Sequence, residues 1–458
     1  MTIDVKISAD FEGGNIEHVE TVENDSVPMP VVRLKVRPDL YTELEKINHM
    51  QYFCFKAVAN ENVKIRYVIA NAGEVSYPEA WPDTTVCFTT TEDYQNVDEA
   101  WRRNLTTRYV GEELVWEHTH TKENPTVYFS YFPPYTYERH CAFMQECEAV
   151  QGAKVSVLGK TNDQHDLHYI CVGDGPLQAW IIHRQHPGET MAEHFAEGLL
   201  RRLLKSNPSD DKDTTVVDKV LSEYTLHIVP CMCPDGAVRG HLRTNGVGAN
   251  LNREWATVHE NYEAPTMKRS PEVYFVLQKM KETGVDFFLD VHGDEELPYN
   301  FISGAEHVPT WGPRLQALHG ALVACYHRTN NHFQAYIGYP PSSGPEETAK
   351  YLNVATNQVA AQFDCLAATL EMPFKDCQTD SEPEIGWNPA KSRKLGASLV
   401  PVLVYLQPYL GRTDNAWTTL PAEDAYIEPT DDYNDFKPLS RRHFSDVREI
   451  HGRVPKTN

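Results

Sequence analysis

The chain has 458 residues and a formal net charge of −23, so it can bury a large core but carries no excess of basic residues. That charge argues against general nucleic-acid binding and against attraction to anionic membranes. The first residues lack a signal-peptide pattern, and no run approaches the roughly 20 apolar residues that span a bilayer. We therefore expect a cytoplasmic protein with no nucleic-acid or membrane partner, whose ten cysteines are free thiols.

Residues 1–148 have the pattern of an all-β domain. Short runs rich in β-branched and aromatic residues alternate with turn residues, which predicts a β-sandwich of about 130 residues. The clearest of these runs are 31–36, 52–58, 63–70, 114–118 and 126–132. His118 and His120 could place two imidazoles on one face of a strand. No third ligand is near them in the sequence, so packing within the domain is the simpler interpretation.

Residues 149–410 have a different pattern, in which apolar strands alternate with segments of helical spacing. Strands are predicted at 154–159, 167–172, 177–183, 224–230 and 286–292, and helices at 190–205, 270–283, 311–327, 346–363 and 390–408. This alternation predicts an α/β domain with a mixed or largely parallel central sheet flanked by helices. The glycine-rich nucleotide motifs and the serine-hydrolase elbow are absent, so neither chemistry is indicated. Cys231 and Cys233 are interpreted as core residues on one face of a strand.

Two predicted strands lead into histidines that could share one metal ion. The strand at 177–183 is followed by His186 and, across a Pro-Gly turn, by Glu189, whereas the strand at 286–292 ends in His292. Because the carboxyl ends of parallel strands meet at one edge of a sheet, these three side chains could converge. Two histidines and a glutamate that leave a fourth position open are typical of catalytic zinc, so we expect one Zn²⁺ per chain.

Glu371 and a group of arginines complete a predicted hydrolase site. Glu371 lies in the apolar run LAATLEMPF, where its carboxylate could take a proton from zinc-bound water; a surface or helix-capping glutamate is the alternative. The loop 239–255 is rich in glycine and asparagine and carries Arg239, Arg243 and Arg253. Guanidinium groups pair with carboxylates in a bidentate manner, so the cluster indicates an anionic group to be held, although each arginine alone could be a surface charge.

Several short motifs together resemble the carboxypeptidase A-type (funnelin) family of zinc carboxypeptidases. In chain order these are H-P-G-E at 186–189, N-L-N-R at 250–253, D-V-H-G at 290–293 and T-L-E at 369–371. Three further segments resemble the cytosolic carboxypeptidase branch, namely DFEGGN at 10–15, VYFSYFPPYTY at 127–137 and PDG at 234–236. The resemblance extends over most of the chain and implies an α/β zinc-carboxypeptidase domain preceded by the all-β sandwich.

The resemblance also implies roles for individual residues. It assigns zinc binding to the His-Glu-His trio, and it makes Glu371 the general base that activates water and then protonates the leaving amine. Arg243 would polarise the scissile carbonyl, whereas Asn252 and Arg253 would grip the terminal carboxylate of a peptide or protein substrate. Asp290, two positions before a zinc ligand, could orient that ligand.

Two features of the substrate site remain open in the sequence. The family has a tyrosine in a loop that closes over the substrate, and spacing does not choose between the candidates Tyr336, Tyr339 and Tyr351. The base of the specificity pocket is expected about fifteen positions before Glu371, near 353–358, where no arginine is found. The cytosolic branch is known for removing glutamates, and Lys350 could serve such a preference. The preferred terminal residue is therefore undetermined.

Residues 411–458 lie beyond the resemblance. Their low hydrophobicity predicts a loosely ordered extension, which Trp417, Tyr426 and Phe436 could dock onto the body.

The whole chain is predicted to be a zinc metallocarboxypeptidase, with a β-sandwich that could contact other proteins and with removal of glutamate as one option. The alternatives are a zinc amidohydrolase of N-acyl amino acids and a non-catalytic protein-binding module.

Overall fold

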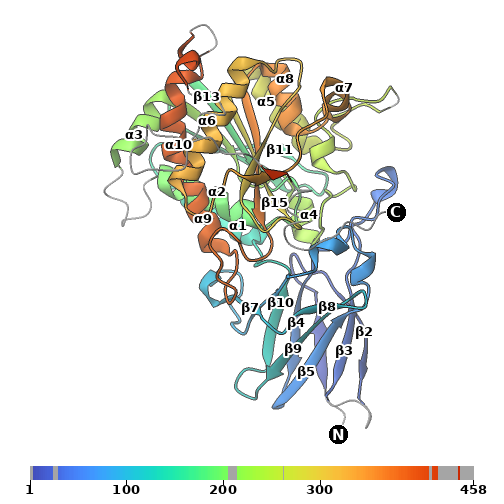
Figure 1. Cartoon of the computed structure of the whole chain (residues 1–458). Coiled ribbons are helices and arrows are strands. Elements are labelled where there is room, and N and C mark those ends of the chain that lie inside the picture. Colours follow the sequence, from blue (N-terminus) through green and yellow to red (C-terminus); the bar gives the residue numbers. More distant parts are fainter. Residues whose placement is uncertain are drawn as a thin grey trace.

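The computed structural model describes residues 4–23, 29–204, 214–260, 262–411 and 415–420, together with the backbone of 442–443. Figure 1 shows a β-sandwich at the bottom of the view and a larger α/β domain above it. This architecture confirms the predicted fold class. In the described part of the chain, no helix combines the length and the apolar character that a membrane span requires.

The β-sandwich consists of two five-stranded sheets, with strand orders β1-β4-β10-β6-β7 and β2-β3-β5-β9-β8. The strands are β1 (Val5–Ser8), β2 (Glu17–Val22), β3 (Val31–Lys35), β4 (Cys54–Ala59), β5 (Val63–Ile69), β6 (Val86–Thr89), β7 (Arg102–Asn104), β8 (Arg108–Val110), β9 (Glu113–His120) and β10 (Thr126–Ser130). Aromatic rings from the two sheets meet between them, because alternate residues of each strand point inward. Tyr67 of one sheet lies 4.9 Å from Phe129 of the other, centroid to centroid, and 5.6 Å from Trp116 of its own sheet.

His118 and His120 of β9 make contacts within the β-sandwich. His120 is buried, with Nε2 at 2.6 Å from the Tyr67 hydroxyl and Nδ1 at 2.9 Å from the Pro125 carbonyl oxygen. Burial lowers the pKa of His118 to about 4, and its ring packs edge-on against Phe129. Both ring nitrogens of His120 are therefore already engaged within the β-sandwich.

The α/β domain is built on a seven-stranded mixed sheet of order β11-β12-β14-β13-β15-β18-β16. Its strands are β11 (Ala153–Lys160), β12 (Asp166–Val172), β13 (Leu177–His183), β14 (Tyr224–Val229), β15 (Phe287–Asp294), β16 (Phe301–Gly304) and β18 (Leu366–Pro373). The four central strands β14, β13, β15 and β18 run parallel, and the outer strands run antiparallel to their neighbours. Every residue of β15 is buried, as expected for a strand covered on both faces.

Helices cover both faces of this sheet. They are α1 (Tyr137–Glu148), α2 (Met191–Leu203), α3 (Thr214–Glu223), α4 (Pro234–Arg239), α5 (Pro271–Thr283), α6 (Pro313–Thr329), α7 (Pro345–Thr348), α8 (Ala355–Phe363), α9 (Pro389–Ala397) and α10 (Leu399–Leu406). Alternate residues of β15 belong to different cores: Leu289 packs with the α2, α9 and α10 side, whereas Phe288 packs with α5 and α8. The 3₁₀ turns are η1 (Thr42–Leu44), η2 (Ala72–Glu74), η3 (Pro78–Ala80), η4 (Asp98–Ala100), η6 (Leu251–Arg253), η7 (Ala349–Tyr351), η8 (Gln407–Tyr409) and η9 (Ala416–Thr419).

Two helices predicted as continuous are divided, so these two predictions were wrong. In 346–363 the helix breaks before α8, because Val354 has an extended backbone with φ −82° and ψ 138°. In 390–408 the break falls at Ser398, between α9 and α10. Pro401 has no N–H to donate to Ala397, which weakens a continuous helix at this point but is tolerated in the first turn of a new one.

The described part of the C-terminal extension packs on the α/β domain. Trp417 of η9 contacts the main hydrophobic core, and Leu420 is buried. The short strands β17 (Ile337–Gly338) and β19 (Arg442–His443) pair in parallel. Tyr426 and Phe436 lie outside the described residues, as does most of the segment predicted to be loosely ordered.

Buried charges join the two domains. Arg103 of β7 donates to the carbonyl oxygens of Phe374 and Trp387 at 2.9 and 2.7 Å. Asp98 of η4 accepts from Arg139 of α1 at 2.7 and 3.0 Å and also contacts Arg393 of α9. These contacts fix the β-sandwich against the α/β domain.

Glu272, in the first turn of α5, is a buried carboxyl with a perturbed pKa. It is fully buried, and Asn245 Nδ2 donates to its Oε2 at 3.2 Å. Burial, assisted by the negative charge of Asp235, raises its pKa from 4.5 to about 8. The folded protein therefore keeps a proton on Glu272 that the unfolded chain has already released. This group contributes most to stability below pH 4.5 and loses that contribution as the pH rises toward 8.

We expect Glu272→Gln to increase the free energy of unfolding relative to wild type, by an amount that grows as the pH rises from about 5 to 8. One pKa unit corresponds to about 1.4 kcal/mol, so the gain has an upper limit of about 4 kcal/mol near pH 8. Urea unfolding at several pH values measures the difference. Glu282→Gln, on an exposed position of the same helix, is the matched control and should change stability by less than about 0.5 kcal/mol throughout. A gain that does not vary with pH would contradict the prediction.

Candidate active site

Three neighbouring strands bring the predicted site residues to one edge of the sheet. His186 and Glu189 lie in the turn between β13 and α2, His292 lies near the end of β15, and Glu371 lies near the end of β18. β13 pairs with β15, and β15 pairs with β18 so that His292 stands opposite Glu371. The parallel register therefore explains why residues such as His292 and Glu371, 371 − 292 = 79 positions apart, become neighbours, as at other carboxyl edges of such sheets.

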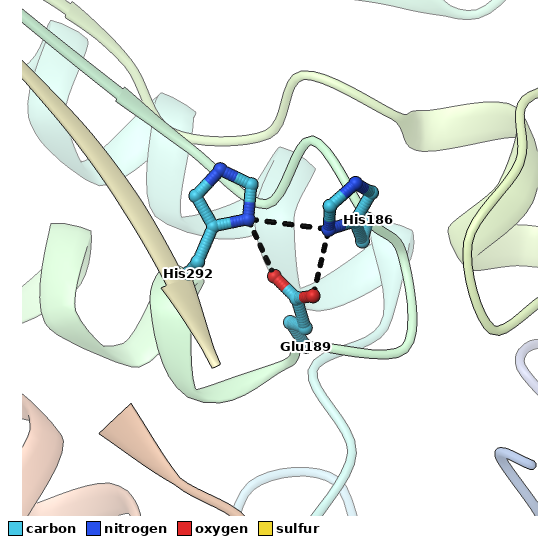
Figure 2. A group of neighbouring side chains, drawn as sticks. All are labelled: His186, Glu189 and His292. Carbon is cyan, nitrogen blue, oxygen red and sulfur yellow. Dashed lines mark hydrogen bonds and ion pairs between the residues drawn. The ribbon is translucent and has the colours of Figure 1, made fainter. Parts of the chain in front are cut away.

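His186, Glu189 and His292 form a compact buried group (Figure 2). The two oxygens of Glu189 reach different histidines: Oε1 lies 2.7 Å from His186 Nδ1, and Oε2 lies 2.9 Å from His292 Nδ1. The two Nδ1 atoms are 3.2 Å apart. One ligand atom from each residue can be chosen so that all lie within 4.8 Å of one another, which is a suitable arrangement for a single metal ion.

The other nitrogen of each histidine has its own partner. Asp290 Oδ2 lies 2.8 Å from His292 Nε2 and also accepts from Gln185 at 2.6 Å, while Asn250 Oδ1 lies 3.1 Å from His186 Nε2. These acceptors favour a proton on Nε2 and leave the Nδ1 lone pairs directed at the common point. Burial lowers the pKa of His186 to about 3, so that ring is neutral at pH 7, as a metal ligand must be. The donor set therefore fits zinc.

The turn that carries these ligands has no room for a side chain at Gly188. Gly188 N donates to Leu242 O at 2.9 Å, and a Cβ on Gly188 would lie 2.9 Å from the same oxygen. This close backbone contact holds the Pro-Gly turn against the arginine-bearing loop. It explains on steric grounds why glycine occupies this position of H-P-G-E.

Glu371 is a buried carboxyl with a free oxygen. The residue is 7% exposed, and among the described residues its Oε2 has no hydrogen-bond partner. Burial raises its pKa well above the ordinary value, and the charge of Glu189 raises it further, although His292 opposes the shift. A carboxyl of this kind next to a metal site has the high proton affinity expected of a general base.

Two more acids follow His292, and they locate one of the candidate tyrosines. Asp294 Oδ2 accepts from the Tyr339 hydroxyl at 2.5 Å, and the Tyr339 ring packs edge-on against Phe301 of β16. Glu295 is buried, and its Oε1 has no partner in the described part of the chain. The Tyr336 ring instead packs edge-on against His327. Tyr339 thus contacts Asp294 beside the site, while Tyr351 lies near enough to Arg253 to influence its pKa.

The three arginines of the loop 239–255 have different environments. Arg239 forms an ion pair with Asp163 at 2.7 Å and donates to Gly246 O, which accounts for its charge. Within the described residues, Arg243 and Arg253 have no carboxylate within ion-pair distance. Burial and the nearby Arg243 lower the pKa of Arg253 to about 10, because two cations are held close together. The pair is therefore suited to an external anion.

Asn252 of η6 is oriented by its own hydrogen bonds. Its Oδ1 accepts from Ala355 N at 2.9 Å, and its Nδ2 lies 3.5 Å from His292 Nε2. The amide group therefore presents its donor side toward the site.

At the predicted base of the specificity pocket, Thr356 is buried and its hydroxyl lies 2.7 Å from that of Thr369. Lys350 is exposed.

Two family models together match most of the chain. Residues 7–132 match the cytosolic carboxypeptidase N-terminal domain, and residues 141–376 match zinc carboxypeptidase. The chain belongs to the zinc carboxypeptidase family. It is a metallocarboxypeptidase, a hydrolase, whose N-terminal domain is that of the cytosolic carboxypeptidases, which confirms the resemblance in the sequence. The family implies zinc as the metal.

Some relatives align with most of this chain, and others align with less than half of it. Protein ZMO1242 of Zymomonas mobilis is 36% identical over 404 residues, which are 87% of this chain and 96% of that protein. Cytosolic carboxypeptidase 6 of Mus musculus is 24% identical over 197 residues, 40% of this chain and 34% of its own length. Among solved structures, a metallo-carboxypeptidase from Pseudomonas aeruginosa, in complex with (2-guanidinoethylmercapto)succinic acid, is 36% identical with a TM-score of 0.77, and one from Burkholderia cenocepacia is 34% identical with a TM-score of 0.78. Each aligns with 89% of this chain and 100% of its own.

Sequence reasoning missed several residues around the site. Asn250, Gln185 and Glu295 were not singled out, although all three lie within, or no more than two residues from, motifs that were. Their signal was position alone: Asn250 is in N-L-N-R, and Glu295 follows D-V-H-G by two residues. Asp39, which belongs to the β-sandwich, had no signal in the sequence, because only the packing of the two domains places it beside the arginine loop.

Proposed function

We propose that this metallocarboxypeptidase releases the C-terminal residue of peptides or proteins at the site formed by His186, Glu189, His292 and Glu371. The observation that supports this most is the meeting of three features at one sheet edge. These are a three-residue metal site, a buried carboxyl with an unpartnered oxygen, and two arginines without an acidic partner in the described structure. Bound zinc would polarise the scissile carbonyl and lower the pKa of water at the site.

In this proposal the side chains divide the work. Glu371 accepts the proton of the attacking water at its free Oε2 and then delivers that proton to the leaving amine. Arg243 stabilises the negative charge that develops on the carbonyl oxygen. Arg253 and Asn252 Nδ2 bind the terminal carboxylate, so that only the last peptide bond of the substrate is aligned for cleavage. Tyr339 would close over the bound residue from the side of Asp294.

A terminal glutamate is the first substrate to test, because the resemblance to the cytosolic branch implies it. Thr356 precedes Glu371 by 371 − 356 = 15 positions, where the base of the specificity pocket is expected, and it is polar but uncharged. Binding of the glutamate side-chain carboxylate would therefore depend on Arg243 or Arg253, which are close enough together for Arg243 to lower the pKa of Arg253.

We also propose a cytoplasmic location, in keeping with ten free cysteines, and protein contacts through the β-sandwich.

We expect purified protein to contain about one zinc per chain and to shorten peptides by single residues from the C-terminus. A peptide panel that differs only in the last residue, analysed by mass spectrometry, measures the preference. N-acyl amino acids are assayed in parallel to detect amidohydrolase activity. Chelation followed by zinc addition is the internal control, since activity should be lost and then restored. Zinc binding without release from any peptide would overturn the proposal, and so would full activity of the metal-free protein.

A further inference from the structure

A carboxylate of the β-sandwich lies against the turn that carries Arg243. Asp39 is 5% exposed and accepts four hydrogen bonds from the α/β domain. Its Oδ1 accepts from Leu242 N at 2.7 Å, and its Oδ2 accepts from Arg243 N, Thr244 N and Thr244 Oγ1 at 2.8, 2.9 and 3.0 Å. One side chain of one domain thus satisfies three consecutive backbone N–H groups of the other.

Other contacts from the β-sandwich also hold this turn. Asn15 of the β-sandwich donates to Gly240 O at 2.9 Å, and Leu40 N donates to His241 Nε2 at 3.3 Å. Further along the loop, Glu45 Oε1 accepts from Asn250 N at 3.2 Å. Buried backbone N–H groups need partners, and between α4 and η6 the loop has little regular structure to provide them.

The same turn contacts the segment that carries two of the metal-binding residues. Leu242 donates its N–H to Asp39 and accepts, through its carbonyl oxygen, from Gly188 N at 2.9 Å. Gly188 stands between His186 and Glu189 in the ligand turn. Asp39 is therefore hydrogen-bonded directly to the backbone of Arg243. It is also linked through Leu242 to Gly188, in the turn that carries His186 and Glu189.

Arg243 depends on its backbone for position. In the described residues its guanidinium group has no carboxylate within ion-pair distance, so no strong side-chain contact fixes where it lies. Charge stabilisation in a transition state depends on where the donor lies, and a displacement of about 1 Å can reduce turnover by about 10²-fold. A shift of the 242–244 turn would move Arg243 with it.

We propose that Asp39 is a positioning residue for this carboxypeptidase, through which the β-sandwich sets the place of Arg243. The inference rests on the role proposed for Arg243. It gives the β-sandwich a part in catalysis, because without Asp39 the turn has three unsatisfied N–H groups. The carboxylate acts through Arg243 and does not touch the substrate.

Asp39→Asn is the central variant, because it keeps the size of the side chain but replaces one acceptor oxygen with a donor group. Whichever way the amide is turned, its NH₂ faces at least one backbone N–H. We expect kcat to fall about 10-fold with little change in KM and unchanged zinc content. Thr244→Val, which removes only the hydroxyl donor, should have a smaller effect of the same kind and serves if Asp39→Asn does not fold.

A double-mutant cycle with Arg243→Ala distinguishes positioning from general stability. If Asp39 acts through Arg243, Asp39→Asn should lower kcat by less than about 2-fold once Arg243 is already alanine. Asp98→Asn is the matched control, since Asp98 is another buried aspartate of the β-sandwich that accepts hydrogen bonds from Arg139 and contacts Arg393. It should lower the melting temperature but leave kcat/KM within about 2-fold of wild type.

Two results would overturn the inference. One is a full additional loss from Asp39→Asn in the Arg243→Ala background, and the other is an equal loss of kcat from Asp98→Asn. A different result tests the proposed function on which it rests: wild-type activity of Arg243→Ala alone would remove the role of Arg243. The two failures can therefore be told apart within the same set of variants.

Discussion

Glu371→Gln is expected to lower kcat by about 10²–10⁴-fold while zinc content stays the same. Glutamine keeps the shape of the side chain but cannot accept and return the proton of the attacking water. The fold should tolerate the change, because Glu371 Oε2 has no partner among the described residues and burial already disfavours its charged form. Single-turnover kinetics on a C-terminal peptide, with metal analysis of the same sample, measure the effect.

Glu295→Gln is the matched comparison for this variant. Glu295 is also a buried acid with one unpartnered oxygen in the described structure, and burial together with the charge of Glu189 raises its pKa as well. If Glu371 is the base, Glu295→Gln should keep most of the wild-type kcat, whereas Glu371→Gln should not. The reverse order of the two activities would move the role to Glu295, and equal wild-type activity of both would leave neither as the base.

Arg243→Ala and Arg253→Ala are expected to reduce activity in different ways. Loss of Arg243 should lower kcat by about 10²–10³-fold, because its charge is needed where negative charge develops in the transition state. Loss of Arg253 should mainly raise KM, because it removes binding energy that the bound substrate and the transition state share. Steady-state kinetics on one peptide give both parameters for each variant.

A peptide and its C-terminal amide separate these roles further. Wild-type protein should prefer the free acid, and Arg253→Ala should lose most of that preference, whereas Arg243→Ala should slow both substrates. Arg239→Ala is the control from the same loop: its side chain pairs with Asp163, so kcat/KM should stay within about 3-fold of wild type. An unchanged preference for the free acid in Arg253→Ala would show that another group binds the terminal carboxylate.

Local pattern was sufficient to predict the main elements of this protein. Short β-branched and aromatic runs separated by turn residues predicted the β-sandwich, and the alternation of apolar strands with helical spacing predicted the mixed sheet. The same information was insufficient at 346–363 and 390–408. There an extended residue and a proline divide helices whose apolar spacing continues on both sides of the break. The domain boundaries after 148 and 410 remain predictions.

The sequence by itself determined which residue types could form the site. His186 and Glu189 share one turn, His292 and Glu371 end apolar strands, and strand ends of a parallel sheet must meet at one edge. These are local properties of short segments, so they can be read without coordinates. The functional roles of these residues stay proposals, and the experiments above test them.

Only the tertiary structure decided which neighbours complete the site. Nothing in the spacing of Asp39 links it to Arg243, 243 − 39 = 204 residues away, because the contact depends on how the two domains pack. The hydrogen bond between Tyr339 and Asp294 and the ion pair between Arg239 and Asp163 also depend on packing. Such contacts join surfaces that are distant in the chain, and no local periodicity records them.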